Sequence, residues 1–417
     1  MSELRTRSNR SVKNPVVARH GRQRKQGPWG AIFAFVGAAL VVLLVSGGSL
    51  AAIVVNQLRS NITTVALIGE TEGPPPSIGA YEGGFNILIV GSDRCEDPNG
   101  CRDRGADLND VTMLLHVSAD QTNAVAVSIP RDMVVPIPSC PAEDGSGNNF
   151  AMAGRPINET LFYGGLPCTV LTVEALTGLD IQFAGLITFN GVIQMTDAVG
   201  GVDVCVTEPI FDPYTGLNVP AGISNLSGGQ ALAFLRTRHG VGDGSDLTRI
   251  SSQQVYLSSL VRTLKSAGTL GDPFKVYALA QAATTNMTLS SGFSNLDTLA
   301  SIALALKDIP IDRVTFVQYP GTTGQPGIYL GKVAPIKGKA DELFAKIKAD
   351  EPFLLEAAGD GRGSELDPNA PVAEAEPVPS GSAAASAEPV APAEPLATIT
   401  GVRGQSAADY TCAIANN

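Results

Sequence analysis

Several common catalytic signatures are missing from the 417 residues of this chain. There is no G-x-x-x-x-G-K-[ST] phosphate loop, no G-x-S-x-G nucleophile turn and no H-E-x-x-H zinc motif. Only three histidines occur, His20, His116 and His239, and they are far apart in the sequence. A zinc site built from histidine is therefore not expected.

Basic residues are scarce beyond the first 28 positions. Residues 1–28 carry eight Lys and Arg against one Glu, whereas the whole chain has 29 Lys and Arg against 40 Asp and Glu. The part after residue 28 is therefore strongly acidic. Because proteins that bind a phosphate backbone present a basic face to it, we expect no nucleic-acid partner. Hydrophobic residues make up 44% of the chain, enough to bury a core, which excludes global disorder.

Charged residues are also absent from Gln26 to Leu58. Within this stretch residues 29–55 are almost wholly apolar, and a helix needs about 20 such residues to cross a bilayer. The apolar region of a cleavable signal peptide is shorter, about 7–15 residues. We therefore interpret 29–55 as a single, uncleaved transmembrane anchor in the cell membrane. The basic arm at 1–28 orients the N-terminus to the cytoplasm and everything from about residue 56 to the outside.

All six cysteines follow this predicted anchor, and no C-x-x-C pair occurs among them. An even number of cysteines in an oxidising compartment favours disulfides, and six cysteines allow 15 pairings. The simplest set joins Cys95 to Cys101, Cys140 to Cys168, and Cys205 to Cys412. The last of these would connect the tail of the sequence to its body.

Short apolar runs alternate with helical patterns over residues 84–266. We expect strands at 85–90, 111–117, 124–129 and 202–206, and helices at 169–177, 189–198, 227–236 and 249–264. Such alternation favours a layered α/β domain. Residues 267–350 hold two or three more helices and a strand at 313–319, and we assign them to the same domain, 84–350. Residues 56–83 form a connector.

Proline, alanine and glutamate dominate residues 366–396, which contain seven Pro and no Lys or Arg. This composition predicts disorder, and we assign a disordered linker to 351–396. A short tail at 397–417 carries the last cysteine.

Acidic, arginine and amide side chains lie at the ends of the predicted elements. They are Asp93 after the first strand, Asp110 before the second, Arg131 and Asp132 after the third, Arg236 and Arg238 at the end of the helix at 227–236, and Arg249 with Gln253 in the helix at 249–264. Carboxylates bind a hard cation such as Mg²⁺, arginines grip phosphates, and ligands of layered α/β folds collect at strand ends. The pattern predicts a site for a diphosphate and a metal ion, although each residue alone is more typical of a surface or ion-paired side chain. We assign Asp243 and Asp246 to a solvated turn.

Five motifs occur in a fixed order between residues 84 and 266. They are NILIVGSD at 86–93, SIPRD at 128–132, INETLFYGG at 157–165, DAVGGVDV at 197–204 and GQALAFLRTRHG at 229–240. This series resembles the LytR-CpsA-Psr family of bacterial membrane-anchored enzymes. The segment AADYTC at 407–412 is similar to the end of actinobacterial members.

The resemblance implies a three-layer α-β-α sandwich and a phosphotransferase. It implies that a glycopolymer passes from a polyprenyl-diphosphate carrier to peptidoglycan, at the muramic acid 6-hydroxyl, through a phosphodiester bond. It also implies that Asp93 and Asp110 hold Mg²⁺ (or Mn²⁺) on the diphosphate. The implied clamp, which offsets charge in the transition state, consists of Arg131, Arg236, Arg238 and Arg249, assisted by Gln253. Asp132 is our candidate for the general base.

Two positions depart from the family pattern. Leu108 stands where the family commonly has an arginine two residues before Asp110, and Ser252 stands where a second arginine is common. Arg102 or Arg104 could substitute for the first. Two alternatives therefore stay open, a non-catalytic scaffold that binds the lipid diphosphate or the wall, and a hydrolase of the lipid diphosphate. No motif specifies arabinogalactan, teichoic acid or capsule, so the resemblance implies only the class of polymer.

Overall fold

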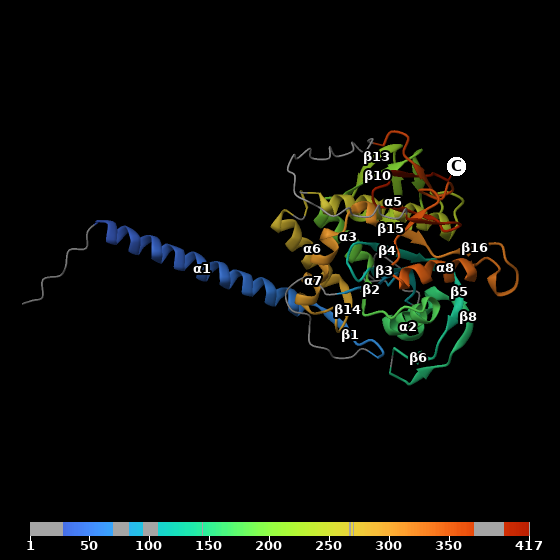
Figure 1. Ribbon diagram of the computed structural model, residues 1–417, viewed down its shortest axis with the longest axis horizontal. Coiled ribbons are helices and arrows are strands. Elements are labelled where there is room, and N and C mark those ends of the chain that lie inside the picture. Colours follow the sequence, from blue (N-terminus) through green and yellow to red (C-terminus); the bar gives the residue numbers. More distant parts are fainter. Residues whose placement is uncertain are drawn as a thin grey trace, which may run out of the picture. The chain divides into compact units, whose positions relative to one another are not determined.

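The computed structural model describes residues 28–69, 83–94, 107–143, 145–266, 268–269, 271–370 and 396–416 (Figure 1). The chain divides into two compact units, Met1–Gln57 and Leu58–Asn417. Some sequence predictions fall outside the described residues. These are the basic arm at 1–27, the Cys95–Cys101 disulfide, the substitute arginines Arg102 and Arg104, and the linker at 371–395.

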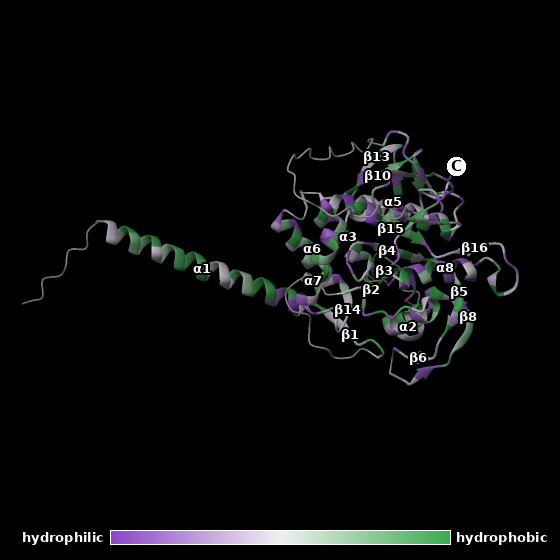
Figure 2. Cartoon of the chain, in the orientation of Figure 1, coloured by the Kyte–Doolittle hydropathy of each residue, from purple (hydrophilic) through white to green (hydrophobic). Residues whose placement is uncertain are grey.

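A single helix, α1 (Pro28–Asn61), contains the stretch expected to cross a membrane. Its residues Ile32–Asn61 include an 18-residue window with a mean hydropathy of 2.5 and are long and apolar enough to span a bilayer. Figure 2 shows hydrophobic colouring along most of this helix. Pro28 stands at the first helical position, where an N–H would have no partner within the helix. Within the described part of the chain, α1 is the one candidate membrane span.

The second unit is built on a mixed eight-stranded sheet (Figure 1). Its strands are, in spatial order, β1 (Thr63–Val65), β14 (Met287–Ser290), β9 (Phe183–Ile187), β2 (Phe85–Ser92), β3 (Asn109–Val117), β4 (Ala124–Ile129), β15 (Val314–Gln318) and β21 (Gly404–Ser406). At the centre β2, β3 and β4 form an antiparallel meander. The flanking strands β9 and β15 run parallel to β2 and β4 respectively.

Side chains of the central strands alternate between two buried faces. On one face Leu88 and Leu114 belong to a core with residues of α2 (Thr160–Thr177) and α8 (Lys337–Lys348). On the other face Phe85 and Ala126 belong to a core with residues of α5 (Asp246–Lys265) and α7 (Leu296–Asp308). Since helices cover both faces, the fold is the predicted three-layer α-β-α sandwich. Two more helices, α3 (Phe189–Val199) and α6 (Pro273–Asn286), pack against each other.

A second, smaller sheet packs against α5 and α4 (Gly228–Arg236) around its own apolar core. Its strand order is β13 (Gly222–Leu226), β10 (Val202–Val206), β22 (Thr411–Ala413) and β19 (Ser364–Leu366). A disulfide joins Cys205 of β10 to Cys412 of β22, and another joins Cys140 to Cys168 of α2. Both predicted pairings are confirmed.

The remaining elements are short. The paired strands are β5 (Val134–Ile137) with β8 (Met152–Pro156), β6 (Cys140–Pro141) with β7 (Asn148–Asn149), β11 (Ile210–Asp212) with β12 (Leu217–Val219), β16 (Gly321–Thr322) with β17 (Ala334–Pro335), and β18 (Phe353–Leu355) with β20 (Ala397–Ile399). The 3₁₀ turns are η1 (Ile157–Glu159), η2 (Ile311–Arg313) and η3 (Gly327–Tyr329).

The disorder predicted for 351–396 is wrong in its first part. Strands β18 and β19 lie in that part, and the buried Phe353 packs in the main core. The tail at 397–417 supplies β20, β21 and β22 to three different sheets, so it is an integral part of the second unit. Prolines are concentrated after residue 366, and β18 and β19 precede them. The sequence also missed β9 and β14, two strands of the main sheet.

Candidate phosphate-binding site

Strand register places the first two residues of the site opposite each other. In the antiparallel ladder Thr112 pairs with Ile129, so the continuation of the two strands sets Asp110 opposite Arg131. Arg131 indeed donates a hydrogen bond from Nη1 to Asp110 Oδ1. Both residues were singled out from the sequence because they flank these strands.

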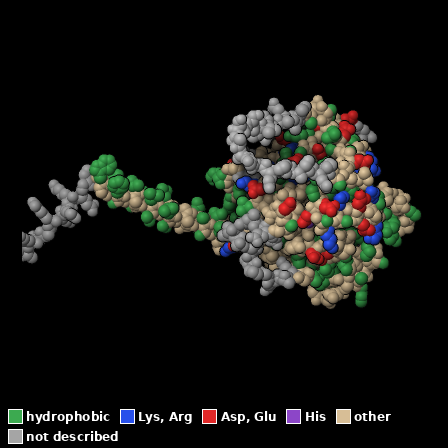
Figure 3. Space-filling model, in the orientation of Figure 1, with side chains coloured by type: hydrophobic (Ala, Val, Ile, Leu, Met, Phe, Trp, Pro, Cys, Tyr) green, Lys and Arg blue, Asp and Glu red, His purple; other side chains and the backbone are tan. Residues whose placement is uncertain are grey.

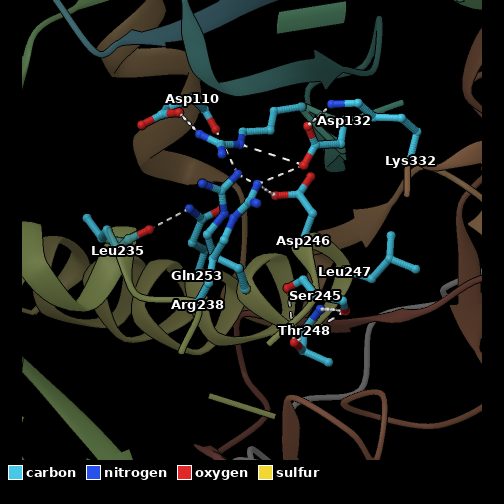
Figure 4. Close-up of polar contacts among 12 residues, drawn as sticks. Asp110, Asp132, Leu235, Arg238, Ser245, Asp246, Leu247, Thr248, Gln253 and Lys332 are labelled. Atoms are coloured by element: carbon cyan, nitrogen blue, oxygen red, sulfur yellow. Dashed lines mark hydrogen bonds and ion pairs between the residues drawn. The ribbon is translucent and has the colours of Figure 1, made fainter. Parts of the chain in front are cut away.

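Four segments deliver further charged groups to the same place (Figure 4). We call the whole set the charge cluster, and it consists of Asp110, Arg131, Asp132, Arg238, Asp246, Arg249 and Lys332. Asp132 follows β4, and Arg238 lies in the loop that follows α4. Asp246 and Arg249 stand in the first turn of α5, and Lys332 precedes β17. The cluster therefore carries four cations and three carboxylates.

Ion pairs connect the cluster through shared carboxylate oxygens. Arg238 Nη2 lies 3.0 Å from Asp132 Oδ2 and 2.9 Å from Asp246 Oδ1. Arg249 Nη2 lies 2.6 Å from the same Asp246 oxygen and also donates to the backbone carbonyl of Asp110 at 2.9 Å. Asp246 thus fixes two arginines, and Arg249 connects the helix to β3.

Several polar atoms of the cluster are buried without a hydrogen-bond partner. They are the Nε atoms of Arg131, Arg238 and Arg249, together with Asp246 Oδ2. A buried donor left without a partner costs about 1–3 kcal/mol, and more where the group is charged. Three guanidinium N–H groups that lack partners would be satisfied by the oxygens of an anion, which makes the cluster suited to a phosphate ligand.

Burial and neighbouring charges act differently on the ionisable groups here. Burial lowers the pKa of Arg249, but the ordinary value is so high that we treat this guanidinium as charged. Burial alone would raise the pKa of Asp132. The hydrogen bond from Lys332 and the charges of Arg238 and Arg131 outweigh it and hold that pKa below its ordinary value. Asp132 is therefore ionised at neutral pH.

Three predicted site residues make their described contacts outside the cluster. The guanidinium carbon of Arg236 lies 4.2 Å from the ring centroid of Phe189, a cation–π geometry. Gln253 Nε2 donates to the Leu235 carbonyl at 2.7 Å and so ties α5 to the end of α4. Asp93 Oδ1 accepts a hydrogen bond from the Leu108 backbone N–H at 2.8 Å.

The sequence missed two members of the cluster. Asp246 was assigned to a solvated turn, which is wrong, since the residue is only 5% exposed and pairs with two arginines. The sequence did contain a signal for Asp246, because an aspartate in the first turn of a helix, three residues before an arginine, favours an ion pair. Lys332 belongs to no motif. Only the tertiary pairing of Val333 with Met133 brings it to Asp132, so no local pattern could have found it.

The predicted metal ligands stand on neighbouring strands. Ser92 pairs with Asn109, which places Asp93 and Asp110 at the same end of the β2–β3 ladder. Magnesium is commonly held by one or two carboxylates together with substrate phosphates and water, and this pair fits such a donor set. One cluster of three potential ligand side chains was found in the described segments, namely Cys205, Cys412 and Asp367. It is not a metal site, since a disulfide joins its two cysteines.

The surface of the second unit contrasts with this charge cluster. On the face shown in Figure 3, acidic and basic side chains are interspersed. That face offers no continuous basic stripe of the kind that a nucleic-acid backbone requires. The cations suited to phosphate are instead concentrated at the end of β4, in the loop after α4, in the first turn of α5 and before β17.

Fold and site together define a mixed α/β protein with a set of arginines suited to phosphate. The profile of the LytR_cpsA_psr family matches residues 56–347, and the chain belongs to this family.

Curated relatives include two proteins of Corynebacterium glutamicum. The chain is 32% identical over 343 residues to the cell wall biosynthesis protein LcpA, a match that covers 74% of this chain and 63% of the relative. It is also 32% identical over 248 residues to the probable cell wall biosynthesis protein LcpB, covering 58% of this chain and 56% of the relative. The matches thus span somewhat less than two thirds of either relative.

A third relative is the polyisoprenyl-teichoic acid–peptidoglycan teichoic acid transferase TagT of Bacillus subtilis, 26% identical over 262 residues, covering 60% of this chain and 75% of the relative. Among solved structures, the LytR-Csp2A-Psr enzyme from Actinomyces oris superposes with a TM-score of 0.52 at 23% identity, covering 69% of this chain and 96% of that one. These likenesses to solved structures show the shared fold.

Proposed function

We propose that this chain is a membrane-anchored transferase that moves a glycopolymer from a polyprenyl-diphosphate carrier to peptidoglycan through a phosphodiester bond. The observation that carries the proposal is the set of Arg131, Arg238 and Arg249, whose Nε atoms are buried and have no hydrogen-bond partner. The name of the Bacillus subtilis relative, which specifies a polyisoprenyl-linked donor and a peptidoglycan acceptor, supports this assignment.

The proposed chemistry is a displacement at phosphorus. An acceptor hydroxyl of peptidoglycan attacks the phosphorus that carries the glycan. The bond from that phosphorus to the bridging oxygen of the diphosphate breaks, and polyprenyl monophosphate leaves. The hydroxyl proton passes to a base, for which Asp132 is the candidate. Arg131, Arg238 and Arg249 offset the negative charge that the equatorial and leaving oxygens carry in the transition state.

Asp93 and Asp110 are the proposed ligands of Mg²⁺ or Mn²⁺. When bound, the ion would neutralise charge on the diphosphate oxygens. Asp110 also accepts a hydrogen bond from Arg131, so its carboxylate would position that arginine beside the diphosphate. Asp246 plays the matching role for Arg238 and Arg249, which share its Oδ1 atom.

We further propose that α1 anchors the protein with residues 1–27 in the cytoplasm and the second unit outside. The two disulfides of the second unit support an oxidising compartment, because cytosolic proteins rarely keep structural disulfides. The donor lipid and the peptidoglycan acceptor would both be available on that side of the membrane.

The test uses the full chain in detergent micelles, a short-chain polyprenyl-diphosphate glycan, peptidoglycan fragments and Mg²⁺, with products identified by mass spectrometry. We expect a glycan joined to the fragment through one phosphate, lost in Arg131→Met and Arg238→Met. Release of glycan phosphate without joining would favour a hydrolase. Binding of the donor without turnover would favour a scaffold.

A further inference from the structure

Lys332 reaches the charge cluster from a part of the chain that the sequence motifs do not include. The segment after β15 runs through β16 and η3 and returns at Val333, whose N–H donates to the Asp132 carbonyl at 3.1 Å. The Val134 N–H donates in turn to the Val333 carbonyl at 3.0 Å. These two backbone bonds fix Lys332 next to Asp132, and its Nζ lies 3.1 Å from Asp132 Oδ1.

Both carboxylate oxygens of Asp132 are engaged in this arrangement. Oδ1 accepts from Lys332, and Oδ2 accepts from Arg238 at 3.0 Å and lies 3.9 Å from Arg131 Nε. An acceptor hydroxyl that must give up a proton needs one of these oxygens. Lys332 therefore occupies one acceptor position of Oδ1 and lowers the pKa of the carboxylate that must take this proton.

The two cations on Asp132 differ in how firmly they are held. Arg238 is shared with Asp246, so two carboxylates fix it, and its side chain is 24% exposed. The Lys332 side chain is 37% exposed and reaches Asp132 from the rim on a flexible four-carbon stem. Lys332 is thus the cation that can most easily change partner.

The two departures from the family pattern bring no charge to the cluster. Leu108 stands in place of one common arginine, and its backbone binds Asp93. Ser252, in place of the other, is buried and donates to the Thr248 carbonyl at 3.2 Å. Lys332 adds a positive charge to the cluster from another segment, where a diphosphate would bring additional negative charge.

We propose that Lys332 is a substrate ligand that exchanges Asp132 Oδ1 for an oxygen of the donor diphosphate, so that binding of the donor frees this carboxylate oxygen for the acceptor hydroxyl. In the subsequent step the hydroxyl oxygen bonds to the glycan-side phosphorus, polyprenyl monophosphate leaves, and the hydroxyl proton goes to Asp132 Oδ1. The inference rests on the proposed function, and it adds an order of events, since the base becomes available only after the donor has bound.

The first test measures binding without turnover. The full chain in detergent micelles is titrated calorimetrically with farnesyl diphosphate, without acceptor, for the wild type and the Lys332→Met, Lys332→Arg and Lys337→Met variants. Loss of one charge-assisted bond should weaken binding about tenfold in Lys332→Met, and arginine should restore it to within about twofold. Lys337→Met is the matched control, since Lys337 lies on α8, pairs with Asp341 and is 85% exposed. Equal binding by Lys332→Met and the wild type would overturn the inference.

The second test follows the pH dependence of kcat/KM. The charged groups that face Asp132 are Arg131, Arg238 and Lys332. Removal of Lys332 leaves the two arginines, so the acidic limb of the profile should move to higher pH in Lys332→Met and return in Lys332→Arg. An acidic limb that does not move in Lys332→Met would contradict the proposed role of Asp132 as general base. Failure of the wild type to bind the diphosphate would instead refute the proposed function, and the inference with it.

Discussion

Two parts of the charge cluster, which we call the sheet half and the helix half, differ in how they are held. The sheet half, Asp110 with Arg131 and Asp132, lies at strand ends, and its side chains are 12–25% exposed. The helix half, Asp246 with Arg249, stands in the first turn of α5, and its side chains are only 3–4% exposed. A ligand can reach the first half from solvent, whereas the second is part of the packed interior. Under the proposed function, we expect the helix half mainly to maintain the geometry and the sheet half mainly to contact the substrate.

The largest expected effect is a loss of stability when a residue of the helix half is substituted. Asp246→Ala removes the carboxylate that Arg238 and Arg249 share and leaves buried positive charge uncompensated. Breaking a buried pair in this way costs about 3–5 kcal/mol. The change in the free energy of unfolding is measured by urea denaturation of the second unit, monitored by far-ultraviolet circular dichroism. Asp341→Ala is the control, because that carboxylate is 62% exposed, and a change below about 1 kcal/mol is expected there. Equal effects of the two substitutions would contradict the division.

The next largest effect is a loss of activity when a residue of the sheet half is substituted. Arg131→Met should lower kcat by about 10²–10³, the range found when one donor to a transition-state oxyanion is removed. Its effect on unfolding should be small beside that of Asp246→Ala, since Arg131 is partly exposed. Arg155→Met serves as the control in the transfer assay, because Arg155 pairs with Glu159 and is 52% exposed. An Arg131→Met protein that unfolds easily and retains its kcat would reverse the assignment.

The response to acid should distinguish Asp132 from its neighbours. Its pKa in the folded state lies below the unfolded value of about 3.9. The corresponding stabilisation is therefore present above that unfolded value and is lost as the pH falls through the folded pKa. Below about pH 4, the free energy of unfolding should fall less steeply in Asp132→Asn than in the wild type. Parallel curves for the two proteins would show that Asp132 contributes nothing to this loss.

The smallest effect is expected at Gln253. Its Nε2 donates to the Leu235 carbonyl, so Gln253→Ala should cost about 1 kcal/mol of stability, as the loss of a typical hydrogen bond does. The KM for the donor should change by less than about twofold, since ΔΔG below 0.4 kcal/mol corresponds to that factor. A large rise in KM with unchanged stability would instead support the phosphate contact that the family resemblance implies for this residue.

Local sequence patterns were sufficient to predict much of the architecture and part of the site. The central strands were predicted because they are continuous apolar runs, and the structure buries both of their faces. The ends of β3 and β4 then bring Asp110 and Arg131 together. Arg238 and Arg249 also reach the cluster that their motifs suggested. Their chemical roles stay predictions.

Other features depended on contacts distant in the sequence. Arg236 belongs to the same motif as Arg238, yet it stacks on Phe189, because Arg236 ends α4 whereas Arg238 lies in the loop that follows. Lys332 contacts Asp132 only through the return of its segment to Val333, and β18 forms only by pairing with β20 beyond the linker. No pattern within a few residues encodes such contacts.

The central claim is that the charge cluster transfers a glycan phosphate to peptidoglycan. The most direct measurement uses a donor labelled with ³²P at the glycan-side phosphorus, incubated with the full chain and peptidoglycan fragments. We predict that the label appears in the fragment, in a phosphodiester that survives phosphatase treatment, and that Arg131→Met abolishes this transfer within the detection limit. Label recovered only as free glycan phosphate, or unchanged in the donor, would contradict the account.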